Sequence, residues 1–203
     1  MLRIDHVFVG KAVEVTRVEV PEDGTYGQDQ ELEFLVHFNK NMIANTSEGT
    51  PYLSLLIGSS SRQASLISGS GTSVLHFRYR VQEGDSDPDG IAINGLTLNG
   101  GSLTNGNGTS ANLILNNVES TAAVLVDALA PSGYTVVIDQ DPILTTNQEV
   151  ISFSFSGAEI GAAFSYAFTS SGGGTPVTGS GTITTATDQV TGIDLSSLNP
   201  GDI

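Results

Sequence analysis

Apolar and polar residues alternate through two stretches of the chain, Glu31-Leu32-Glu33-Phe34-Leu35-Val36-His37-Phe38 and Val74-Leu75-His76-Phe77-Arg78-Tyr79-Arg80-Val81. A period of two residues is typical of a β-strand that buries one face and exposes the other. The two stretches therefore predict the centre of a β-rich core. The side chains expected to point inward are Leu32, Phe34, Val36, Phe38, Leu75, Phe77, Tyr79 and Val81.

The same two strands predict their own register. Antiparallel pairing with Phe34 opposite Phe77 brings the apolar faces together, whereas a slip by one residue would turn every apolar side chain to water. This register also sets opposite charges across from each other on the outer face, at roughly 0.2–1 kcal/mol for each pair. The predicted ion pairs are Glu31 with Arg80 and Glu33 with Arg78.

Further strand-like runs follow, separated by turn signals roughly every 8–12 residues. No segment shows the 3.6-residue period of a helix over a useful length, and 24 glycines provide for many turns. We therefore predict an all-β fold and, from the spacing, a β-sandwich. The additional strands are expected at residues 13–20, 52–57, 63–67, 91–93, 96–98, 113–115 and 123–126.

The pattern breaks at Asp127-Ala128-Leu129-Ala130-Pro131-Ser132-Gly133 and then starts again. Residues 150–155 match residues 31–36 in pattern, which indicates two tandem domains, 1–127 and 128–203. The second half provides for about five strands, fewer than the seven of an immunoglobulin-like sandwich, so we expect it to be incomplete at its C-terminus. Its strands are expected at residues 134–139, 150–155, 163–169, 177–184 and 189–195.

An incomplete second domain would leave an apolar face and a strand edge uncovered. Exposed edges recruit further strands, so we expect a strand-mediated dimer. Either residues 4–9 of a neighbouring molecule or the second domain of another copy would cover the edge. The expected inner face consists of Ile151, Phe153, Phe155, Phe164, Tyr166 and Phe168.

The charge balance narrows the range of partners. The chain carries 22 acidic and 7 basic residues, a net charge of −15, and every Lys and Arg precedes residue 128. Nucleic acid is an improbable partner because phosphate binding needs clustered basic side chains. No run approaches the roughly 18 apolar residues of a membrane span. No signal peptide is visible, so the chain is either cytosolic or part of a longer protein; the absence of cysteine fits both a reducing compartment and bacterial secretion.

An acidic loop, Gly84-Asp85-Ser86-Asp87-Pro88-Asp89-Gly90, follows the strand at residues 74–81. Carboxylates at alternate positions, closed by a glycine that permits a tight turn, provide the oxygen ligands that calcium prefers. We therefore predict a calcium site at Asp85, Asp87 and Asp89, with Glu83 as a further ligand. An EF-hand is excluded because Leu96 stands where that motif needs a glutamate. The alternative is a solvated acidic turn.

Sequence motifs of catalysis were not found. The chain has no Gly-x-Ser-x-Gly elbow, phosphate-binding loop or His-Glu-x-x-His pair, and without cysteine it has no thiol nucleophile. His6, His37 and His76 are far apart in the sequence, and Asp139 and Asp141 fit a turn better than an acid–base pair. We therefore expect a protein that is not an enzyme.

Several motifs in combination resemble a known family. They are Val18-Glu19-Val20-Pro21, Glu33-Phe34-Leu35-Val36-His37-Phe38, the run from Leu75 through the acidic loop to Ile91, Leu96-x-Leu98-Asn99-Gly100-Gly101 and Val126-Asp127-Ala128-x-Ala130-Pro131. Together they look like the tandem bacterial Ig-like repeats of large surface and secreted adhesins, strongly over residues 13–131 and more weakly beyond.

The resemblance implies an extracellular stalk or adhesion module without catalysis, often stiffened by calcium. Its partners would be neighbouring Ig-like repeats of the same protein and a surface receptor or glycan. The alternative is a pair of accessory domains, carbohydrate-binding or spacer, from a secreted hydrolase. A carbohydrate-binding surface usually needs exposed aromatic rings, and this chain has no Trp and few Tyr.

Overall fold

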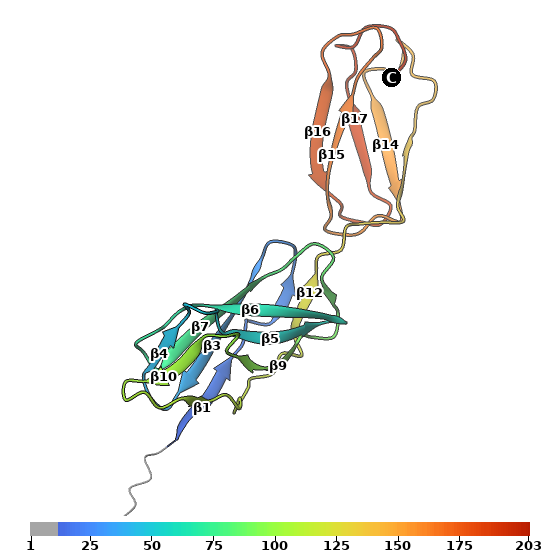
Figure 1. The fold of residues 1–203 in the computed structure, drawn as a ribbon. Coiled ribbons are helices and arrows are strands. Elements are labelled where there is room, and N and C mark those ends of the chain that lie inside the picture. The colour runs from blue at the N-terminus through green and yellow to red at the C-terminus, as the bar shows by residue number, and fades with distance from the viewer. Residues whose placement is uncertain (1–11) are drawn as a thin grey trace, which may run out of the picture. The chain divides into compact units, whose positions relative to one another are not determined.

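A computed structural model describes residues 12–203, in which every regular element is a β-strand (Figure 1). The fold is all-β, as the sequence predicted. The predicted strand at residues 4–9 and His6 lie outside the described residues. The described residues form two compact units: unit 1 ends at Leu129 and unit 2 begins at Ala130.

Unit 1 contains a sheet with the strand order β11-β1-β3-β7-β6-β5-β9, a pair β10-β4 and a small sheet β2-β12-β8. The strand bounds are β1 (Val13–Glu19), β2 (Gly24–Tyr26), β3 (Glu31–Phe38), β4 (Met42–Asn45), β5 (Tyr52–Ile57), β6 (Ser60–Ser68), β7 (Val74–Arg80), β8 (Ser86–Asp87), β9 (Ala92–Thr97), β10 (Ser102–Asn105), β11 (Ala111–Asn112) and β12 (Val124–Asp127).

The predicted register of the two central strands is confirmed. Strands β3 and β7 pair antiparallel along their length, with Phe34 opposite Phe77 and Glu31 opposite Arg80. Both phenylalanines are fully buried. The predicted ion pairs are wrong, however, because Arg78 bonds to Glu31 and Arg80 to Asp29. The predicted inward side chains of both strands all belong to the core of unit 1.

Other strand predictions for unit 1 were less accurate. The runs at residues 91–93 and 96–98 form one strand, β9, and residues 113–115 form no strand. The short strands β2, β4, β8, β10 and β11 were missed. Each has two to four residues, too few for an alternating pattern to be recognised. One of them, β8, lies inside the acidic loop.

The first and last strands of unit 1 are held by partners from distant parts of the sequence. Strand β1 pairs parallel with β11, through Val13 and Ala111. Strand β12 pairs parallel with β2, through Val124 and Gly24. The segments through which the chain enters and leaves unit 1 are thus both fixed by parallel pairing.

Unit 2 contains two small sheets, β13-β14-β17 and β15-β16. Its five strands lie close to the predicted runs. Between the sheets lies a core that includes Ile151, Phe153, Phe155 and Phe168, whereas Phe164 and Tyr166 are only half-buried. The bounds are β13 (Thr135–Ile138), β14 (Ile151–Ser156), β15 (Ala163–Phe168), β16 (Val177–Thr182) and β17 (Gln189–Ile193).

Candidate functional site

The acidic loop of unit 1 leaves β7 and crosses to the end of β12. Of the four predicted calcium ligands, Asp85 and Asp87 are buried, while Glu83 and Asp89 are exposed. Within residues 12–203, no three Asp, Glu or His side chains are grouped so that they could hold a metal ion. The four predicted ligands are therefore not brought together as one set.

Asp85 is held by four donor groups from three residues. The Arg62 guanidinium bonds its Oδ1 through Nε (2.8 Å) and Nη2 (2.7 Å). Its Oδ2 accepts hydrogen bonds from the Tyr79 hydroxyl (2.5 Å) and the Gln82 backbone amide (2.9 Å). Since an ion pair out of water is stable only when the remaining polar groups are also satisfied, this arrangement allows a carboxylate in the interior.

The electrostatics of the cluster follow from these contacts. Burial alone would raise the pKa of Asp85, but the bonds from Tyr79, Gln82 and Arg62 outweigh it and hold that pKa below its usual range. Burial and the bond to Asp85 raise the pKa of Tyr79 to about 12. Asp85 is thus an anion paired with Arg62, and Tyr79 is a neutral donor.

Asp87 has a different environment. Its Oδ2 accepts a hydrogen bond of 2.7 Å from the backbone amide of Gly58, in the turn between β5 and β6. Its Oδ1 is buried and has no hydrogen-bond partner. A buried carboxylate oxygen without a hydrogen-bond partner is costly. Asp87 Oδ1 is therefore the buried oxygen of the loop that is available to bind a cation.

Backbone contacts connect the loop to the last residues of unit 1. The amide of Gly84 donates to the carbonyl of Ala128, and the amide of Ala128 donates to the carbonyl of Asp85, each at 2.8 Å. Strand β8 also pairs antiparallel with β12, with Asp87 opposite Val126. The acidic loop thereby fixes the segment through which the chain leaves unit 1.

Two residues of the Asp85 cluster were missed in the sequence. Arg62 lies on β6, far from the loop in sequence, and no local motif points to it. Tyr79 was predicted only as an inward, core-facing residue. A buried tyrosine needs a partner for its hydroxyl, and this requirement was the one available signal that a polar group lay nearby.

Asp139 of unit 2 is a structural carboxylate. It accepts hydrogen bonds from the hydroxyls of Ser152 (2.6 Å) and Ser154 (2.9 Å) on β14 and from Gln189 (2.8 Å) on β17. These bonds connect three neighbouring segments of one sheet. They satisfy the Asp139 carboxylate without a bound ligand.

No family model matches the chain, and no curated protein matches it. Over residues 12–203 there is no helix with the length and hydropathy required to cross a membrane.

Proposed function

We propose that this chain is a non-catalytic structural or adhesive module of a large extracellular bacterial protein. Its two units would be tandem Ig-like β-sandwich domains. The second would be open along β15, where a seven-stranded sandwich carries its last hairpin. Neighbouring repeats of the same protein and a surface receptor or glycan would be its partners.

The observation that carries this proposal is how the ends of unit 1 are held. Force applied along a chain enters this unit at β1 and leaves at β12, and both strands pair parallel with a distant segment. Pulling the two ends therefore loads the hydrogen bonds of the β2–β12 ladder together, in shear. The acidic loop adds the Ala128 bonds and the ion pair between the half-buried Arg62 and the buried Asp85 at the exit. These features suit a module that transmits tension.

We also propose a calcium ion at one position of the acidic loop. Because Arg62 already neutralises Asp85, the oxygen open to a cation is Asp87 Oδ1. We place calcium there, with backbone carbonyls or water completing the oxygen set. Arg62 would then hold the first half of the loop and calcium the second.

Accessory domains of a secreted hydrolase remain the alternative. A spacer between a catalytic domain and a surface would use the same parallel pairing at its ends. The complete reading frame decides between the two, since a hydrolase would carry a catalytic domain in the same polypeptide.

Single-molecule pulling tests the mechanical role. Because the chain has no cysteine, handles can be attached at Ala12→Cys and Leu129→Cys, or at the exposed pair Asp23→Cys and Ala123→Cys. The first pair shears the β2–β12 ladder, whereas the second opens it from one end. We expect unit 1 to unfold at clearly higher force through the first pair. Equal forces in both geometries would contradict a load-bearing role.

A further inference from the structure

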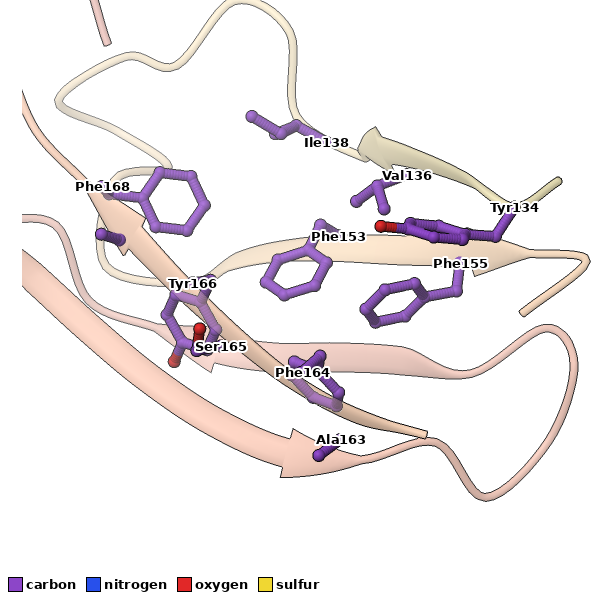
Figure 2. A pocket seen from close by; sticks show the side chains of 11 residues that line it. Tyr134, Val136, Ile138, Phe153, Phe155, Ala163, Phe164, Ser165, Tyr166 and Phe168 are labelled. Carbon is purple, nitrogen blue, oxygen red and sulfur yellow. The ribbon is translucent and has the colours of Figure 1, made fainter. Parts of the chain in front are cut away.

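Unit 2 has an apolar groove between β13 and β15. Its cavity volume is about 420 Å³, and Figure 2 shows aromatic rings from β14 and β15 lining it beneath Tyr134 and Val136. Tyr134 and Val136 are each 48% exposed although they point into the groove. The main lining residues are Tyr134, Val136, Ile138, Phe153, Phe164 and Tyr166.

The rings of β15 are seated firmly at the base of this groove. Phe164 lies opposite Gly181 and Tyr166 opposite Gly179 on β16. A side-chain atom at either glycine would lie within 2.8 Å of the facing ring. The absence of a side chain at Gly179 and Gly181 thus lets both rings lean over the backbone of β16. The groove is built into the strand pair, not left by a loose side chain.

Both walls of the groove are free strand edges. Among the strands of residues 12–203, β15 pairs only with β16 and β13 only with β14. An extended segment placed in the groove would gain main-chain hydrogen bonds from β15 and apolar contacts from the rings. Such strand addition combines affinity from the backbone with specificity from alternate side chains. The geometry therefore favours a β-strand as occupant.

The acidic residues of unit 2 indicate what kind of strand would fill the groove. Residues 130–203 contain seven acidic residues and no Lys or Arg. Glu159 lines the adjoining cavity at the Tyr134 and Phe164 end, and Asp141 and Asp202 line the cavity that adjoins Ile138. A partner strand with a basic residue at each end would complement these acidic groups.

The chain itself contains such a segment. Residues 4–9, Ile-Asp-His-Val-Phe-Val, follow Arg3 and precede Gly10-Lys11. They match the six residues of β15 in length. We propose that residues 4–9 of a second copy of this chain add to the edge of β15 and fill the groove. Asp5 must face solvent, so the alternation places Ile4, His6 and Phe8 inside and Val7 and Val9 outside.

This proposal concerns self-assembly and does not depend on the adhesive role. Because the chain has no Trp, Phe8→Trp introduces a single indole that reports on the groove, and Val7→Trp is the matched control on the opposite face. As the concentration of the full chain rises, we expect the Phe8→Trp emission to shift to shorter wavelength together with an increase in mass by analytical ultracentrifugation. The Val7→Trp emission should stay that of a solvated indole while the mass still rises.

A second pair of variants tests the groove side. Val136 faces the groove, and its neighbour Val137 points to the other face of β13 and is 61% exposed. Val136→Asp should abolish the assembly, and Val137→Asp should leave it intact. Neither change removes a fully buried side chain, so folding is retained in both. A chain that stays monomeric at high concentration, a Phe8→Trp emission unaffected by concentration, or equal effects of the two aspartates would each overturn the proposal.

Discussion

Arg78 Nη1 bonds Glu31 Oε2 at 3.0 Å, although the residue directly opposite Arg78 in the β3–β7 ladder is Glu33. The bond is diagonal. Adjacent strands in a sheet are twisted relative to each other, and diagonal neighbours remain within reach of long side chains. Arg80 is paired in the same way: it bonds Asp29 at 3.1 Å and not Glu31, which lies opposite it. Each arginine thus bonds the acidic residue that stands two positions before the one directly opposite.

This diagonal pairing predicts a specific pattern of coupling. A double-mutant cycle between Arg78→Ala and Glu31→Ala should give a coupling free energy of about 0.2–1 kcal/mol, as for exposed ion pairs. The matched cycle between Arg78→Ala and Glu33→Ala should give almost none. Urea denaturation of the four variants in each cycle measures both values. The larger coupling at Glu33 would show that the directly opposite pair forms in solution.

The fold of this chain could be predicted where burial decides which face of a strand points to the core. Phe34 and Phe77 belong to apolar faces that must meet, because a slip of one residue would expose the whole apolar set, and the charged ends of both strands favour the observed register over a slip of two. The ion pairs on the outer face could not be predicted, because Arg78 reaches two carboxylates at almost equal cost in water. The acidic loop was harder still, since its partner Arg62 comes from a strand that the local sequence does not connect to it.

The buried pair in the loop should matter far more for stability than the exposed pairs. Arg62→Ala leaves the buried Asp85 carboxylate without its countercharge; because the Arg62 side chain is 27% exposed, we expect a cost of about 3 kcal/mol, the low end of the range for a fully buried pair. Asp85→Ala should be similarly destabilising because it leaves Arg62, Tyr79 and Gln82 without their acceptor. Arg80→Ala is the control, because its pair with Asp29 is exposed on both sides, and it should cost at most about 1 kcal/mol. Guanidinium unfolding of unit 1 compares them; equal losses for Arg62→Ala and Arg80→Ala would refute a buried pair.

The raised pKa of Tyr79, about 12, predicts a loss of stability at alkaline pH. Between pH ~10 and the folded-state pKa, the unfolded chain releases the tyrosine proton while the folded chain keeps it. The unfolded state then binds fewer protons, so the free energy of unfolding falls as pH rises. The melting temperature of unit 1 should decline across this range, and Tyr79→Phe should reduce the slope. Tyr134→Phe, an exposed tyrosine in unit 2, is the control and should leave the slope unchanged.

Gly90, which closes the acidic loop, should tolerate substitution less well than Gly84, which opens it. Gly84 and Gly90 both have positive φ, 85° and 103°. A Cβ at Gly84 would meet open space, whereas a Cβ at Gly90 would lie 2.6–2.8 Å from backbone atoms of Thr121 and Ala122. Gly84→Ala should therefore cost only backbone strain, about 1–3 kcal/mol, and Gly90→Ala clearly more. Thermal melting of the two variants checks the order, and an equal loss would mean that the Thr121–Ala122 segment moves aside without cost.

The calcium proposal predicts a reversal in the effect of one substitution. If calcium binds Asp87 Oδ1 in the folded state alone, a hundredfold excess over Kd raises the free energy of unfolding by about 2.7 kcal/mol. Wild type should then melt higher in ~10 mM calcium than in chelator, since extracellular calcium sites bind at roughly 0.1–1 mM. Asp87→Asn should show no such difference. In chelator, however, the wild type retains a buried carboxylate oxygen without a partner, so Asp87→Asn should melt at the same temperature or higher. An Asp87→Asn variant that melts lower than wild type by the same amount with and without calcium would assign Asp87 a purely structural role through its bond to Gly58.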